Sequence, residues 1–268
     1  MTHNIQKVLI TGCSYSANNE QSGWKENNLD KTYHGIIEAK TGWKITNRAM
    51  GGCSNREIAQ RTVENCLSDH YDFCIVQWSS LHRFWLYEEL NNVDDETQIL
   101  PSAKGRMTVG NAPYTIEKLL VSHYLNDYMA LKHWLHDQIM IQSFLNKNCI
   151  PYVFVRGSIN YIPELETLAE QWPKDNIPSL NIPSCIKDLL NFDDNSDDYL
   201  YKKLSSLILA YLSIDKSNCI GYNRIETIYG LDPTLVRDYA DDGAHPGHLV
   251  NTAISNAILH YIEKKYKF

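Results

Sequence analysis

The chain has 268 residues, 43% of them hydrophobic, and carries a formal net charge of −7. This apolar content suffices for one substantial core, so we expect a single domain over residues 1–268. The acidic balance lacks the clustered positive charge that phosphate binding requires, which excludes nucleic acid as a main partner.

None of the seven cysteines lies in a Cys-x-x-Cys pair. The sequence therefore predicts neither a zinc ribbon nor a thioredoxin-like redox site, and we expect no metal and no cofactor. The first residues are polar and lead directly into an apolar run, and no such run approaches the roughly 18 residues of a membrane span. We expect a cytoplasmic protein with reduced cysteines and no membrane partner. The sequence predicts no particular oligomeric state.

Short apolar segments bounded by turn signals are typical of buried parallel strands. In chain order they span residues 7–12, 43–50, 72–79, 151–157 and, more weakly, 218–223. Helical patterns occupy residues 31–42, 54–70, 114–148 and 247–266. A glycine stop ends the first of these helices, and a Ser or Asn cap opens the second. Strand and helix alternate, which predicts an α/β fold with a parallel sheet covered on both faces.

Two stretches are longer than ordinary connections. Residues 80–114 are polar, aromatic and rich in turn residues, and residues 158–200 contain four prolines and an acidic run. We interpret both as excursions from one domain.

A serine follows the first predicted strand, in the stretch "GCSYS" at residues 12–16. The stretch lacks the second glycine and the lysine of a phosphate-binding loop, and it lacks the glycines of a dinucleotide fingerprint. It also fails the G-x-S-x-G pattern, because Ser16 stands where the second glycine belongs. Ser14 is therefore either a nucleophile at the end of a buried strand or part of a polar turn.

The stretch "YADDGAHPGHLV", residues 239–250, places Asp242 three residues before His245. A carboxylate at this spacing can orient the imidazole, as Ser–His–Asp catalysis requires, and Asp241 is the alternative partner. The other interpretation is that Asp242 caps the following helix and His245 lies on the surface. Ligands bind beyond the carboxyl ends of the strands of an open parallel sheet, so this loop and Ser14 are expected to meet there.

The sequence resembles the SGNH (GDSL-type) hydrolases, whose marker blocks appear here in order as "GCSYS", "NRAMGGCSNREI", "QWSS" and "DGAHP". The resemblance implies a three-layer α/β/α sandwich with a flavodoxin-like, five-stranded parallel sheet. It implies Ser14 as the nucleophile, with Asp242 and His245 completing the triad. It also implies an oxyanion site made by the N–H groups of Ser14 and Gly52, with Ser79 as a further donor.

Two residues depart from the family pattern: Cys13 replaces the usual Asp, and Ser79 replaces the usual Asn. Losing one oxyanion donor costs about 10²–10³ in rate, which Ser79 itself or Arg83 would have to offset. Arg83, Trp78 and Arg156 are candidate substrate contacts. A surface salt bridge for Arg83 and core packing for the aromatic residue are the simpler interpretations.

The resemblance implies a serine esterase that hydrolyses a small acyl ester, with an acetyl group on a carbohydrate as the favoured substrate. Its partner is then a small-molecule or glycan ester, and no cofactor takes part. Two alternatives remain open at this point. One is a catalytically degenerate fold that serves as a binding or structural module. The other is an acyltransferase on the same scaffold.

Overall fold

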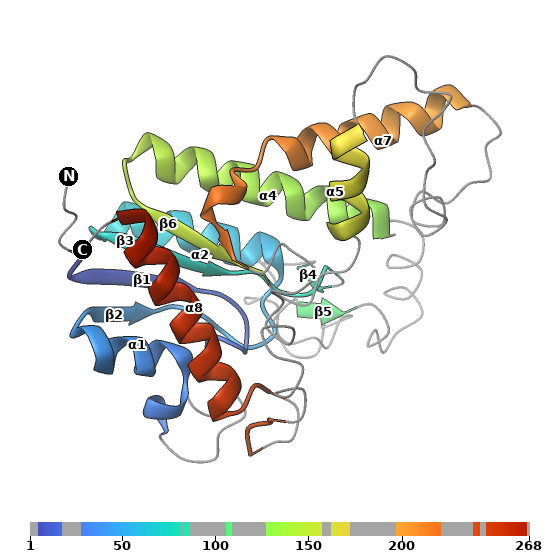
Figure 1. The fold of residues 1–268 in the computed structure, drawn as a ribbon. Coiled ribbons are helices and arrows are strands. Elements are labelled where there is room, and N and C mark those ends of the chain that lie inside the picture. The colour runs from blue at the N-terminus through green and yellow to red at the C-terminus, as the bar shows by residue number, and fades with distance from the viewer. Residues whose placement is uncertain are drawn as a thin grey trace, which may run out of the picture.

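A parallel sheet of five strands lies at the centre of the computed structural model (Figure 1). The structure describes residues 5–17, 28–81, 83–85, 106–108, 127–156, 162–171, 197–220, 238–241 and 245–266. The strands are β1 (Lys7–Thr11), β2 (Lys44–Asn47), β3 (Phe73–Gln77), β6 (Tyr152–Val155) and β7 (Cys219–Ile220). They are ordered β2-β1-β3-β6-β7, and all neighbours are parallel. Each predicted strand is present, and the flavodoxin-like order is confirmed.

Helices cover both faces of this sheet (Figure 1). One face carries α1 (Tyr33–Thr41) and α8 (His248–Tyr266), which pack against each other. The opposite face carries α2 (Asn55–Ser68) and α4 (Asp127–Lys147), followed by α7 (Asp197–Leu212) and α5 (Ile162–Gln171). The predicted three-layer α/β/α sandwich is therefore confirmed. The part of the predicted helix 114–148 before residue 127 lies outside the described residues.

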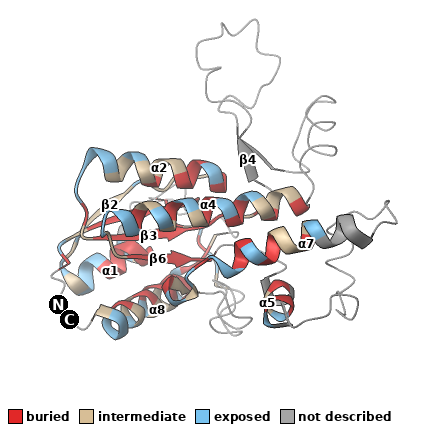
Figure 2. Ribbon diagram, turned by 90° about the horizontal axis from the view of Figure 1, so that it is seen from above, coloured by how far each residue is buried: buried red, intermediate tan, exposed pale blue. Residues whose placement is uncertain are grey.

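Two hydrophobic clusters, one on each face, follow from the alternation of side chains along the strands. Val8 and Ile10 of β1 pack toward α1 and α8, whereas Leu9 packs toward α2 and α4. All five residues of β3 are buried. Figure 2 shows the buried strands lying between helices whose outward turns are exposed. Burying each large apolar side chain contributes about 1.5–3 kcal/mol, so the sheet provides a rigid base for the loops at its carboxyl edge.

The helix boundaries agree with the capping residues. Thr32 caps α1 by accepting a hydrogen bond from the backbone N–H of Gly35, and Gly42 ends this helix with a left-handed φ of 71°. Ser54 caps α2 by accepting from the N–H of Glu57. The predicted glycine stop and the predicted N-cap are thus both confirmed.

Two strands and two α-helices of the described residues were not identified from the sequence. Strands β4 (Arg83–Trp85) and β5 (Arg106–Thr108) pair antiparallel inside the first excursion. Helix α5 lies inside the second excursion, and α7 begins there, in the acidic run. Acidic residues in a first helical turn are favourable because they face the positive end of the helix dipole. None of the described helices is both long and apolar enough to span a bilayer.

Candidate active site

Ser14 lies in a tight turn directly beyond the first strand. The turn spans residues 13–16 and is closed by the N–H of Ser16, which donates to the carbonyl of Cys13 at 3.0 Å. Ser14 is 5% exposed. The two interpretations from the sequence are therefore compatible, because the serine stands at the carboxyl end of a buried strand and also belongs to a polar turn. We call residues 13–16 the nucleophile turn, after the role that the sequence predicts for Ser14.

The side chain of Gln77, the last residue of β3, supports the nucleophile turn. Its Oε1 accepts hydrogen bonds from the backbone N–H of Cys13 at 3.2 Å, from the Cys13 thiol at 3.1 Å and from the Ser16 hydroxyl at 3.2 Å. Its Nε2 donates to the carbonyl of Trp78. Gln77 was not among the predicted site residues, although a glutamine that ends an apolar strand is a signal in the sequence.

Further polar contacts link this turn to α1 and β2. The hydroxyls of Ser16 and Tyr33 lie 2.7 Å apart, and Asn47 Nδ2 donates to the carbonyl of Ser16 at 2.6 Å. His34 Nε2 lies 3.3 Å from Asn47 Nδ2 and 3.1 Å from Thr32 Oγ1. Burial lowers the pKa of His34 to about 4, so its imidazole is neutral at neutral pH. The nucleophile turn therefore rests on neutral groups.

The loop after β2 approaches the nucleophile turn through Met50, whose N–H donates to the carbonyl of Gly12 at 3.1 Å. A turn from Met50 to Cys53 follows, in which the N–H of Cys53 donates to the carbonyl of Met50 at 3.4 Å. Gly52 is its third residue and has a φ of 78°. A left-handed φ at this position is typical of type II turns and favours glycine. The left-handed φ explains why residue 52 is a glycine, and its role as an oxyanion donor stays a prediction.

Ser79 is held by Asn55, the first residue of α2. The Ser79 N–H donates to Asn55 Oδ1 at 2.7 Å, and Asn55 Nδ2 lies 3.4 Å from the carbonyl of Ser79 and 3.3 Å from that of Ser80. The Ser79 hydroxyl is buried and has no hydrogen-bond partner within the part of the chain that the structure describes. The backbone of Ser79 is therefore fixed, while its hydroxyl has no competing acceptor there. The sequence indicated Asn55 only as the alternative cap of this helix, and not as a residue of the site.

His245 lies beside the nucleophile turn. Its ring packs edge-on against the ring of Tyr15, with centroids 5.6 Å apart and planes at 86°. Its carbonyl accepts from the N–H of Ala240 at 2.8 Å, and Tyr239 and Pro246 form a bridge across the same loop. The structure thus brings the predicted base next to the residue that follows Ser14.

Asp242 lies outside the described residues, so the complete triad stays a prediction. Asp241, the alternative partner, is exposed. Asp238 fills the helix-capping role that the other interpretation gave to Asp242, because its Oδ2 accepts from the N–H of Val250 in the first turn of α8 at 2.9 Å.

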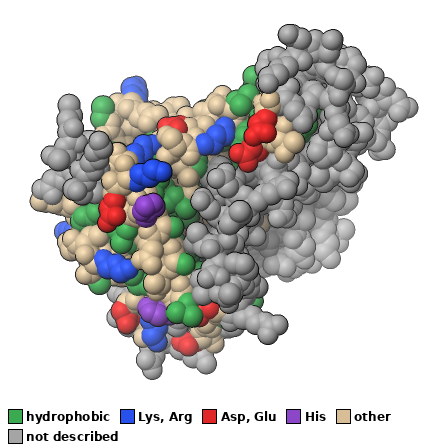
Figure 3. Space-filling model, in the orientation of Figure 1, with side chains coloured by type: hydrophobic (Ala, Val, Ile, Leu, Met, Phe, Trp, Pro, Cys, Tyr) green, Lys and Arg blue, Asp and Glu red, His purple; other side chains and the backbone are tan. Residues whose placement is uncertain are grey.

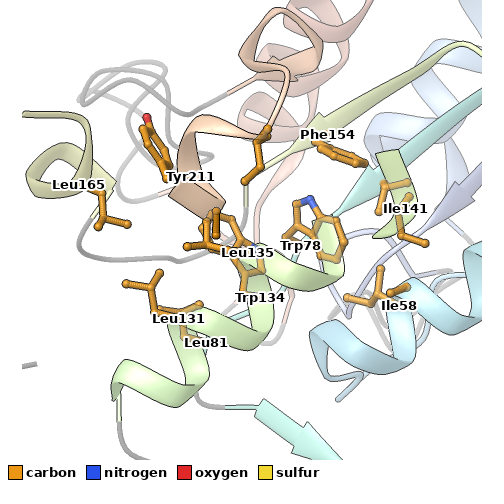
Figure 4. Packing of buried hydrophobic residues seen from close by; sticks show 14 of the residues in the cluster. Ile58, Trp78, Leu81, Leu131, Trp134, Leu135, Ile141, Phe154, Leu165 and Tyr211 are labelled. Carbon is orange, nitrogen blue, oxygen red and sulfur yellow. The ribbon is translucent and has the colours of Figure 1, made fainter. Parts of the chain in front are cut away.

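The three candidate substrate contacts differ in their positions. Trp78 is 0% exposed and packs against Phe154 with ring centroids 5.3 Å apart, inside the cluster that Figure 4 shows. It is a core residue, so the expectation of a substrate contact there is wrong. Arg156 is also buried. Its charge acts on Tyr211 of α7, where burial raises the pKa of the tyrosine and Arg156 lowers it. Arg83 begins β4, but its side chain lies outside what the structure describes.

The charges outside the site are dispersed. On the face shown in Figure 3, Lys and Arg side chains are interspersed with acidic and apolar ones. Between α2 and α4, Arg56 and Asp137 pair at 3.0 Å. Burial raises the pKa of Asp137 to about 7, and Arg56, whose side chain is 53% exposed, opposes this only partly because water screens it. Across the described ranges, no three His, Cys, Asp or Glu residues gather as metal ligands would.

No protein-family model and no curated protein sequence matches the chain. Several solved structures resemble it over nearly its whole length. A lipase/acylhydrolase from Enterococcus faecalis is 11% identical, with a TM-score of 0.45 and 97% of each chain covered. A family 3 carbohydrate esterase from Clostridium thermocellum is 10% identical, with a TM-score of 0.43 and coverage of 98% of this chain and 97% of that one. A single-residue variant of an acetyl xylan esterase from Geobacillus stearothermophilus is 12% identical, with a TM-score of 0.43 and coverage of 96% and 94%.

Proposed function

We propose that this chain is a serine esterase of the SGNH type with Ser14 as its nucleophile. The observation that carries the proposal is the meeting of two distant segments at the carboxyl edge of the sheet. Ser14 lies in the turn beyond β1, and the ring of His245 packs against the next residue, Tyr15. This edge is where open parallel sheets bind their ligands.

In the proposed reaction, His245 accepts the hydroxyl proton of Ser14 while the serine oxygen attacks the ester carbonyl. The N–H groups of Ser14 and Gly52 hold the developing oxyanion, and the Ser79 hydroxyl is a third donor. His245 then protonates the leaving alcohol, and an acyl-serine remains. Water activated by His245 releases the acid, and Asp242 orients the imidazole throughout.

The substrate is a small acyl ester, and the finer proposal is an acetyl ester on a carbohydrate. The finer proposal rests on the resemblance of the sequence to the SGNH hydrolases. It is tested by comparing acetate release from an acetylated xylooligosaccharide with release from p-nitrophenyl acetate. Preference for the sugar ester, as kcat/KM, supports the carbohydrate assignment. Equal or lower kcat/KM on the sugar ester contradicts it and leaves the esterase proposal standing.

The nucleophile and base are tested with p-nitrophenyl acetate. Ser14→Ala and His245→Ala are expected to lower kcat by at least about 10³-fold, because the triad acts as a unit. Ser68→Ala, at an exposed position on α2, is the matched control and leaves kcat unchanged. Wild-type activity in a folded Ser14→Ala variant contradicts the proposal.

The orienting carboxylate is tested by two neighbouring substitutions. Asp242→Asn is expected to lower kcat by up to about 10⁴-fold, because the imidazole loses its oriented tautomer. Asp241→Asn leaves kcat nearly unchanged. The reverse result assigns the role to Asp241, and no effect from either substitution contradicts a Ser–His–Asp mechanism.

A further inference from the structure

We propose that Gln77 is the positioning residue of the nucleophile turn. Its side-chain carbonyl supplies, from β3, the hydrogen-bond acceptor that a cysteine at position 13 does not provide. The catalytic consequence of this proposal rests on the proposed function, whereas the hydrogen-bond arrangement does not. Gln77 does not touch the reacting atoms, and it acts through the turn that carries Ser14.

The three donors that converge on Gln77 Oε1 come from both sides of Ser14. The N–H and the thiol of Cys13 donate from the residue before it, at 3.2 and 3.1 Å. The hydroxyl of Ser16 donates from two residues after it, at 3.2 Å. A single acceptor therefore holds both ends of the turn, and with them the direction of the Ser14 Cα–Cβ bond.

The direction of the hydrogen bonds extends this support to α1. Because the Ser16 hydroxyl donates to Gln77, the Tyr33 hydroxyl, 2.7 Å away, donates to Ser16. Burial raises the pKa of Tyr33 above its ordinary value, which keeps this donor protonated. The chain of donors thus runs from α1 through the nucleophile turn to the end of β3.

Gly12 leaves the space that Gln77 occupies. Thr11 of β1 pairs with Val76 of β3, so the next residue on each strand places Gly12 opposite Gln77. A Cβ atom at residue 12 would lie 3.0 Å from both Cβ and Oε1 of Gln77, and 2.9 Å from the Ser16 hydroxyl. These contacts are tighter than ordinary packing allows. Gly12 and Gln77 are therefore complementary, and the amide fits only beneath a glycine.

The chemistry of an amide suits this position. Gln77 is fully buried, where a carboxylate would be costly to ionise and would place negative charge beneath a developing oxyanion. The amide carbonyl accepts hydrogen bonds and does not titrate, so its support for the turn does not change with pH.

The test uses Gln77→Met, which keeps the length of the side chain and removes the acceptor. We expect kcat for p-nitrophenyl acetate to fall about 10²-fold, the order expected for a displaced nucleophile, with KM unchanged. Gln138→Met removes another fully buried amide, on α4, and is the matched control. It is expected to change stability but not kcat. Equal kcat in the wild type and a folded Gln77→Met overturns the proposal.

Two further measurements separate this proposal from the proposed function. The first is the infrared S–H stretching band of Cys13, which is assigned by subtracting the spectrum of Cys13→Ala. We expect this band at the lower frequency of a hydrogen-bonded thiol. Gln77→Met is expected to shift the band to higher frequency. A free-thiol band in the wild type overturns the arrangement, whether or not the protein is an esterase. If Gln77→Met does not fold, Ser16→Ala removes the donor at the other end of the turn and is expected to lower kcat with KM unchanged. An unchanged kcat in that variant overturns the positioning role.

Discussion

Acidification is expected to destabilise the fold through His34, which contacts Asn47, the residue that donates to the carbonyl of Ser16 in the nucleophile turn. Asn47 Oδ1 accepts from the N–H of Ala49 at 2.9 Å, so its Nδ2 is the group that faces His34 Nε2. His34 Nε2 therefore accepts a hydrogen bond from Asn47 Nδ2. A protonated Nε2 would place its own N–H donor against the N–H donor of Asn47. Burial lowers the pKa of His34 to about 4, against an ordinary value of 6.5. This difference corresponds to about 3 kcal/mol of unfolding free energy.

The sign follows from proton binding. Between pH 6.5 and 4 the unfolded chain binds a proton at His34 that the folded chain does not, so stability is complete above about pH 6.5 and falls as the pH falls toward 4. Urea unfolding across this range measures it. The wild type is expected to lose about 3 kcal/mol more than His34→Gln, which stays neutral, whereas His260→Gln, at an exposed position, follows the wild type. Parallel pH profiles for the wild type and His34→Gln contradict a destabilising protonation of His34.

Three further predictions concern Asn55, Gly52 and Asp137. Asn55→Ala leaves the buried N–H of Ser79 without its acceptor and is expected to lower the unfolding free energy by about 1–3 kcal/mol. Asn55→Asp keeps an acceptor and is expected to lower it by less. Equal losses in the two variants contradict this prediction. Gly52→Ala is expected to cost about 1–2 kcal/mol in thermal unfolding because of its left-handed φ, and Gly51→Ala less; equal costs contradict the turn geometry. Because burial raises the pKa of Asp137 to about 7, the folded chain keeps a proton that the unfolded chain releases near pH 4, so stability falls as the pH rises between these values. Asp137→Asn is expected to remove that fall, and an unchanged difference in Tm between pH 5 and 8 contradicts it.

The fold was largely predictable because its signals are local. The apolar runs predicted the five strands, and Ser54 and Gly42 marked the helix ends where the structure has them. Helix α7 was missed because the acidic run at its start was taken for part of an excursion. Its buried residues, Leu204, Leu207 and Tyr211, nevertheless show helical spacing.

The site was predictable only in part, because its contacts join residues far apart in the sequence. The sequence indicated Ser14 and His245 by their motifs, but the Gln77 contact with Cys13 spans 64 positions and depends on strand register. The position of Trp78 was accessible from alternation, since Cys74, Val76 and Trp78 belong to one core cluster. Trp78, which lies in the marker block "QWSS", was instead predicted as a substrate contact.

The most direct test of Ser14 as the nucleophile is mass spectrometry of the wild-type protein after labelling with a fluorophosphonate. The reagent reacts with an activated serine and requires no knowledge of the substrate. We predict a single phosphonylated residue, Ser14, and loss of the label in His245→Ala, where the base is missing. A label on another serine, or an unlabelled wild type, contradicts the assignment of Ser14 as a catalytic nucleophile.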